Sequence, residues 1–166
     1  MTRRLGASLT PALVERFSQR DMRRRLGIVL PFVTVDADGR PHPMLLSYLE
    51  VRAYDTGTVG LVIGARTRSA ANLTERGAGT LLVIEPEVTI YVKLRTVDGP
   101  LEVAGAADYQ LGYFLLAVEE VLEDAAADWE GGMGITSPLR YAPAPSLDEP
   151  WARATLAALA EPRARA

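Results

Sequence analysis

The sequence predicts an α+β fold, in which a mainly antiparallel β-barrel carries peripheral helices. Two observations lead to this prediction. Between residues 28 and 105, short stretches of strand-forming residues are separated by turn sequences, as at 36–39 and 98–100. Five or six antiparallel strands joined by short turns suit a closed or nearly closed barrel. Stretches with helical spacing lie on either side of these strands, and a short one lies between two of them.

The strands are assigned from alternation of residue type and from the turns that bound them. They are predicted at 28–35, 43–53, 58–64, 80–85, 88–96 and 101–105. The clearest is 88–96, where apolar and polar residues alternate as expected for a strand with one buried face. The strand over 43–53 begins beside Pro41 and Pro43, which have no amide hydrogen to donate. We therefore expect it at a strand end or a sheet edge.

The helices are assigned from spacing and from capping residues. They are predicted from Thr10 to a terminating Gly27, over 67–76, over 108–130 and over 146–160. Thr10 can accept an amide hydrogen bond, Pro11 suits the first helical position, and Gly77 can end the second helix. The longest helix rests on apolar residues that recur at three- and four-residue steps. Ser146 and Glu149 form a capping box before the last helix.

These elements are assigned to a single domain over 1–166, with the barrel core at 28–106 and the helices 108–130 and 146–160 appended to it.

The sequence contains no cysteine, which excludes disulfides, zinc–thiolate sites and thiol nucleophiles. The formal net charge is -3, so we expect no nucleic-acid or membrane partner. No targeting or membrane-spanning segment is evident, and we expect a cytoplasmic protein.

Two groups of residues raise the question of a metal or catalytic site. One side of the helix predicted over 108–130 carries Glu119, Glu120, Glu123, Asp124 and Asp128. Carboxylates one turn apart can hold a metal. No histidine joins them, however, and acidic residues on the outer face of an amphipathic helix are normally solvated, so no metal is predicted. The single histidine, His42, lies between two prolines, where it serves packing or function.

The most informative stretch is 61–73, in which a buried strand leads through a loop rich in hydroxyls and arginines into a helix. The amides at a helix start, with the hydroxyls of Thr67 and Ser69 and the guanidinium of Arg66 or Arg68, can surround a phosphate without a metal. A capped helix with solvated arginines is the alternative. Local chemistry leaves both interpretations open.

Four segments resemble a known family in order and spacing. They are 39–47, 61–64, 67–73 and the strand around 91–93. Together they look like the flavin-binding split barrel of the pyridoxamine 5'-phosphate oxidase superfamily, and the resemblance covers roughly 28–106. It implies an intertwined homodimer with two sites for flavin mononucleotide (FMN) at the subunit interface.

The resemblance also implies site residues. Those that would contact the cofactor are Met44, Leu45, Ser47, Val62, Ile63, Thr67, Arg68, Ser69 and Asn72. The first three would line the flavin ring and ribityl chain, and Val62 and Ile63 would add backbone and packing contacts. The phosphate would be held by Thr67, Arg68 and Ser69. Asn72 would order the loop. No catalytic residue is named.

The chain departs from the oxidases themselves in two places. His42 and Ser47 stand where those enzymes have arginine and lysine, and the C-terminal tryptophan, arginine and histidine signature is missing. Oxidation of pyridoxamine phosphate is therefore not expected. The prediction is an FMN-dependent oxidoreductase acting on an unknown small molecule. The alternatives are a non-catalytic carrier or sensor of flavin or haem, with His42 as the imidazole ligand, a deazaflavin-dependent reductase, and a cofactor-free interaction protein.

Overall fold

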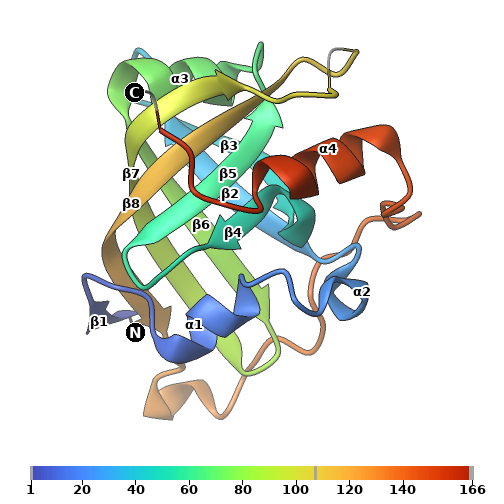
Figure 1. Ribbon diagram of the computed structural model, residues 1–166. Coiled ribbons are helices and arrows are strands. Elements are labelled where there is room, and N and C mark those ends of the chain that lie inside the picture. The colour runs from blue at the N-terminus through green and yellow to red at the C-terminus, as the bar shows by residue number, and fades with distance from the viewer. Residues whose placement is uncertain (1, 107, 165–166) are drawn as a thin grey trace.

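A curled antiparallel sheet, with helices packed around it, forms the body of the molecule (Figure 1). The computed structural model describes residues 2–106 and 108–164. Its strands are β1 (Thr2–Gly6), β2 (Val29–Val35), β3 (Pro41–Ser47), β4 (Val51–Ala53), β5 (Thr58–Gly64), β6 (Ala78–Glu85), β7 (Val88–Glu102) and β8 (Leu111–Asp124). Its helices are α1 (Pro11–Arg16), α2 (Met22–Arg25), α3 (Arg68–Arg76) and α4 (Pro150–Ala158), with short 3-10 turns η1 (Tyr48–Glu50) and η2 (Asp128–Glu130).

The strands run in the order β3-β2-β6-β7-β8-β5-β4, and β1 pairs with the far end of β8. Every pairing is antiparallel, which confirms the predicted fold class. The sheet curls around one core whose largest fully buried side chains include Phe32, Tyr48 and Phe114. α3 lies across one end of the barrel and contributes buried Ala70 and Leu73 to this core (Figure 1).

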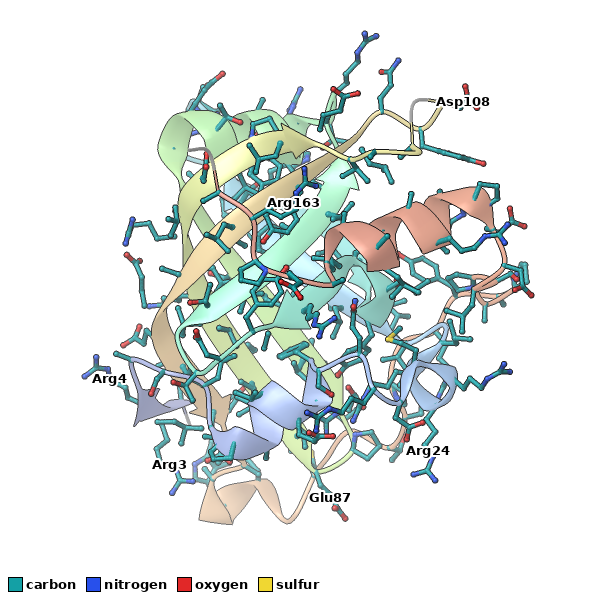
Figure 2. The ribbon with its side chains drawn as sticks, in the orientation of Figure 1. Arg3, Arg4, Arg24, Glu87, Asp108 and Arg163 are labelled. Atoms are coloured by element: carbon teal, nitrogen blue, oxygen red, sulfur yellow. The ribbon has the colours of Figure 1, made fainter. Side chains whose placement is uncertain are left out.

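A second, smaller core lies on the outer face of β5 and β8. Val62 and Tyr113 are buried there beneath α4 and Leu159. Arg163, labelled in Figure 2, lies against the same surface, with its guanidinium carbon 5.5 Å from the centre of the Tyr113 ring. Its backbone amide donates to the Tyr113 hydroxyl at 3.1 Å. The C-terminal segment therefore covers the outside of the barrel at these strands.

Several local predictions are confirmed because they rest on capping chemistry within a few residues. The Thr10 hydroxyl accepts from the Leu13 amide at 3.3 Å at the start of α1. The helix predicted from there to Gly27 is instead divided, because α1 ends at Arg16 and α2 begins at Met22. α3 begins after Thr67 and ends at Gly77, which has the left-handed conformation with φ +69°. β3 is an edge strand, as its prolines indicate.

The helix predicted over 108–130 is wrong. Residues 111–124 form β8, a strand in the middle of the sheet between β7 and β5. Apolar residues fill both odd and even positions from 111 to 118, since Phe114 faces the barrel core and Tyr113 faces the outer core. A strand buried on both faces has no two-residue alternation, and its apolar run also satisfies helical spacing.

The acidic residues of this segment form surface ion pairs with neighbouring strands. Glu119 pairs with Arg95 at 3.0 Å, and Glu120 lies 2.7 Å from Lys93 and 3.0 Å from Arg4. Glu123 accepts from the Arg3 Nε at 2.9 Å, and both basic residues of β1 lie beside the end of β8 (Figure 2). Exposed pairs of this kind contribute little to stability.

Three smaller predictions are corrected. The strand over 43–53 is divided into β3 and β4 by η1, whose start is held by the Ser47 amide bonded to Glu50. The turn at 98–100 lies inside β7, which continues to Glu102 with irregular register on both sides of Asp98. The capping box is absent, because the Ser146 hydroxyl accepts from Asp148 instead and Glu149 caps α4 without a side-chain bond. No helix among the described residues is long and apolar enough to cross a membrane.

Candidate functional site

The barrel is open between β3 and the end of β5. β4 pairs with β5 only as far as Leu61, so residues 62–64 have no ladder partner on that side within the described sheet. β3 ends the sheet on its other side, and η1 connects it to β4. Edge strands present unpaired N–H and C=O groups. We call this gap the opening; it offers two stretches of backbone that a ligand can bind.

α3 starts where β5 ends, so its N-terminus lies at the opening. The Thr67 hydroxyl accepts from the Ala70 amide at 3.2 Å and donates to the Gly64 carbonyl at 2.8 Å. The amides of Arg68 and Ser69 have no acceptor among the described residues, as expected for the first turn of a helix. Two free donors and the positive end of the helix dipole favour an anion here.

Asp36 and Asn72 link α3 to the hairpin between β2 and β3. The Asn72 amide donates to Thr34 Oγ1 at 2.9 Å and to Asp36 Oδ1 at 3.0 Å. This hydrogen bond from Asn72, and then the nearby Arg68, hold the pKa of Asp36 below its ordinary value. Arg68 Nη1 lies 3.4 Å from Asp36 Oδ2, and the Nδ1 atom of His42 lies 4.0 Å from Asp36 Oδ1. Arg68, Asn72 and His42 therefore meet around one carboxylate.

The predicted residues on β3 are spread along the strand. Met44 packs against the barrel core, whereas Leu45 is 50% exposed on the opposite face. Ser47 is buried, and its amide and hydroxyl both donate to Glu50 Oε2, at 2.6 and 3.0 Å. Ser47 lies five positions after His42, or roughly 17 Å along an extended strand. Ser47 thus lies at the end of β3 away from α3.

The side chains of Val62 and Ile63 are both buried. Val62 belongs to the outer core beneath α4, and Ile63 belongs to the barrel core. Only their backbone atoms border the opening. Thr67 and Arg68 are exposed at the start of α3, while the Ser69 side chain is buried and its amide is free.

Comparison with known proteins identifies the architecture. No protein-family model and no curated protein sequence matches the chain. Among solved structures, a candidate pyridoxamine 5'-phosphate oxidase from Lactobacillus delbrueckii is 16% identical, with a TM-score of 0.55 over 72% of this chain and 98% of its own. The chain has the split-barrel fold. The fold expected from the sequence resemblance is therefore confirmed.

Two further structures agree with this split barrel. An FMN-binding protein from Syntrophomonas wolfei is 13% identical, with a TM-score of 0.52 over 70% of this chain and 89% of its own. HupZ from Group A Streptococcus is 11% identical, with a TM-score of 0.51 over 80% of this chain and 99% of its own. At these identities the likeness concerns the fold.

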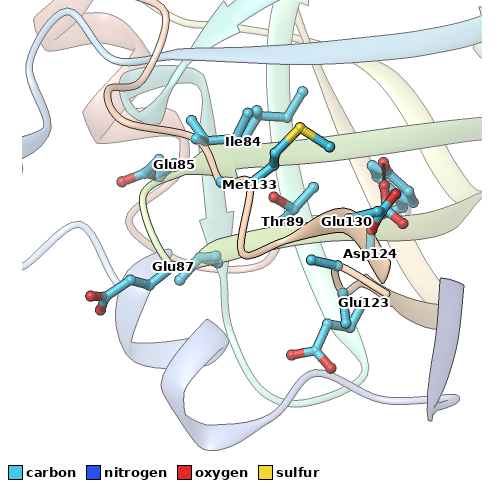
Figure 3. A pocket seen from close by; sticks show the side chains of 14 residues that line it. Ile84, Glu85, Glu87, Thr89, Glu123, Asp124, Glu130 and Met133 are labelled. Carbon is cyan, nitrogen blue, oxygen red and sulfur yellow. Dashed lines mark hydrogen bonds between the residues drawn. The ribbon is translucent and has the colours of Figure 1, made fainter. Parts of the chain in front are cut away.

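Two cavities lie near the ends of the described barrel. One, of about 410 Å³, begins at Ala65 and Arg66, directly before α3. The other, of about 650 Å³, lies at the far end of the barrel, with Glu85 and Glu87 on one side and Glu123, Asp124 and Glu130 on the other (Figure 3).

Two carboxylates of the larger cavity are engaged within the protein. Glu85 pairs with Arg16 at 2.9 Å, and the Tyr91 hydroxyl donates to Asp124 at 2.8 Å. No group of three or more histidines or carboxylates in 2–106 and 108–164 is arranged to hold a metal ion.

Sequence reasoning missed Thr34, Asp36 and Arg76 as members of the α3 cluster. Arg76 donates to the Asn72 side-chain oxygen and to the Val35 carbonyl, both at 2.7 Å. Asp36 was interpreted only as a turn residue. The sequence did contain a signal at Thr34, because it lies two residues after apolar Phe32 and so shares its strand face. In the structure Thr34 is fully buried. A polar residue at an inward position requires a hydrogen-bond partner from another element.

Proposed function

We propose that this split barrel binds FMN along the opening between β3 and β5 and acts as an oxidoreductase on a small molecule. One observation carries the proposal: the free amides of Arg68 and Ser69, together with the exposed Arg68 guanidinium, lie at the end of this opening. A phosphate monoester matches these donors in charge and in hydrogen bonding.

The remaining residues fit an elongated ligand whose phosphate lies at α3. Thr67, Arg68 and the Ser69 amide would hold the phosphate. Met44, Leu45 and the backbone of Val62 and Ile63 would flank the rest of the molecule. Ser47 would fix the turn at the far end of β3, and Asn72 would hold α3 against β2. A bound flavin supplies hydride or electron transfer, and the protein positions it and limits its contact with water.

A homodimer is part of the proposal. Antiparallel sheets that face water normally carry polar residues on that face. On β3, β2 and β6, however, the outward residues are mainly apolar: Pro31 lies opposite Leu45, and Val33 lies between Pro43 and Thr80. We infer that a second copy of the chain covers this face beside the opening.

Lysine in place of Leu45 is expected to weaken the dimer at least about tenfold, because it places a charge in the centre of the apolar face. Analytical ultracentrifugation over a concentration series measures this change. Leu5→Lys is the matched control, since Leu5 is 36% exposed on β1, which pairs with β8 and not with β2, β3 or β6, and it should leave association unchanged. A wild-type protein that stays monomeric at every concentration would contradict the proposed interface.

Alanine in place of Arg68 is expected to weaken FMN binding by about tenfold to a hundredfold, the range for losing a charge-assisted hydrogen bond. The measurement is a titration followed by the visible absorbance of the flavin. Riboflavin lacks the phosphate, so its affinity should not change in Arg68→Ala. Arg23→Ala, at an exposed arginine on α2, is the control for a general loss of positive charge.

The same titration separates the alternatives. Retention of a deazaflavin coenzyme in preference to FMN would favour a deazaflavin-dependent reductase. A Soret band with haem that is lost in His42→Ala would favour a haem carrier. Protein that retains none of these cofactors would overturn the proposal in favour of an interaction protein.

A further inference from the structure

The smaller cavity is lined by Ala65 and Arg66, which directly precede the proposed phosphate site in the chain. Its volume is about 410 Å³, within the range of small-molecule sites. Apolar residues form most of its lining: Ala65, Pro100, Leu101, Val103, Ala106 and Leu111. Arg66, Glu102 and Gln110 supply the polar groups. Arg66 immediately precedes the helix cap Thr67, so a molecule in this cavity lies beside the start of α3.

The wall that carries Arg66 is held in place by specific contacts. The Ala65 amide donates to the Gln110 carbonyl at 2.7 Å, and Gln110 adopts a positive φ of 49°, which is uncommon for a residue other than glycine. A side chain at Gly112 would place its Cβ 3.0 Å from Pro100 and 3.3 Å from Ala65. Glycine therefore allows the 65–66 segment to approach β8. Backbone strain of this kind recurs at binding sites.

Arg66 is the charged group suited to recognise a ligand here. It is exposed and forms no ion pair with any residue in 2–106 or 108–164, whereas Arg68 is paired with Asp36 and Arg76 with Glu75. A guanidinium beside apolar walls binds a carboxylate in a paired, charge-assisted geometry that is stronger than in open water. Glu102 lies in the same lining and repels an anion beside it, so the carboxylate of a ligand is expected at Arg66 and not next to Glu102.

We propose that this cavity binds a small organic anion with an apolar body, its carboxylate held by Arg66 and its body by the apolar walls. The assignment of this anion as the substrate of the flavoprotein rests on the proposed function. The binding itself does not, because none of the cavity residues is among those proposed to hold FMN.

The test uses the full chain without flavin and three probes that share a benzene ring: benzoate, benzyl alcohol and benzylamine. Amide NMR shifts of Arg66, Val103, Ala106 and Gly112 report binding at the cavity. Benzoate is expected to shift these amides saturably and at least about tenfold more tightly than benzylamine. Arg66→Met, which keeps an apolar stem, should weaken benzoate about tenfold. Arg23→Met, at another exposed arginine without an ion pair, should not.

Equal affinity for benzoate and benzylamine, no saturable shift at these amides, or an unchanged affinity in Arg66→Met would each overturn the proposal. FMN titrations of the same variants separate it from the proposed function. Arg68→Ala lies outside the cavity lining, so it should weaken FMN binding and leave benzoate binding intact. Benzoate binding without FMN binding would support the anion site and contradict the proposed FMN-dependent function.

Discussion

Alanine in place of Gly79 is expected to lower the free energy of unfolding by about 3 kcal/mol, at the upper end for overpacking a core. Gly79 lies within β6, and the ring of Phe32 from β2 crosses directly over it. An added Cβ would lie 2.3 Å from Phe32 Cζ and 2.8 Å from Cε2. Phe32 is fully buried, so its ring cannot move aside into solvent. Chemical denaturation measures the loss.

A double-mutant cycle shows whether this clash is the cause. Phe32→Leu removes the ring atoms that meet the new Cβ, so Gly79→Ala should cost markedly less in the Phe32→Leu background. Gly134→Ala is the control, because nothing lies within 4 Å of its added Cβ, and its effect should stay within about 0.5 kcal/mol. Strictly additive losses would show that Phe32 does not cross Gly79.

Glutamine in place of Glu50 is expected to make stability less dependent on pH. From pH 5 to pH 8, Glu50 should lower the free energy of unfolding of the wild type by about 2–3 kcal/mol, and the variant should not show this loss. Burial raises the pKa of Glu50 from 4.5 to about 7, although two hydrogen bonds from Ser47 act in the opposite direction. No described cation forms an ion pair with this carboxyl. The folded protein therefore prefers the protonated form.

The sign follows from that preference. Because the folded pKa lies above the unfolded one, the contribution of Glu50 is fully present below about pH 4.5 and is lost as the pH rises to about 7. Glutamine stays neutral and can still accept from Ser47, so this loss should vanish in the variant. Urea denaturation at pH 5 and pH 8 gives the difference. Glu161→Gln, at an exposed site, should show the same change in stability between the two pH values as the wild type. The same change in Glu50→Gln would contradict a raised pKa of Glu50.

Elements defined by local chemistry could be predicted from the sequence. The start and end of α3 depend on Thr67 and Gly77, which act on backbone groups within four residues. β5 depends on an apolar run between two turns, and its predicted bounds are those observed. The same short range explains why the start of α3 could be proposed as an anion site from the sequence alone.

The cluster behind that site could not be predicted, because its members come from distant elements. Asn72 meets Thr34 and Asp36 only after α3 packs across β2, some 36 to 38 residues away in the chain. Arg68 was predicted to face a phosphate, and the fold places Asp36 beside it. Spacing within a segment carries no information about such a partner.

The amino-acid sequence by itself determined the capped helices, the edge character of β3, the antiparallel class and the resemblance to split barrels. Only the tertiary structure decided that residues 111–124 are a strand. Apolar side chains at successive positions satisfy a helix stripe and a doubly buried strand equally well. Residues 111–124 form a strand because β5 and β7 supply backbone partners on both edges, and because the barrel core and α4 cover both faces.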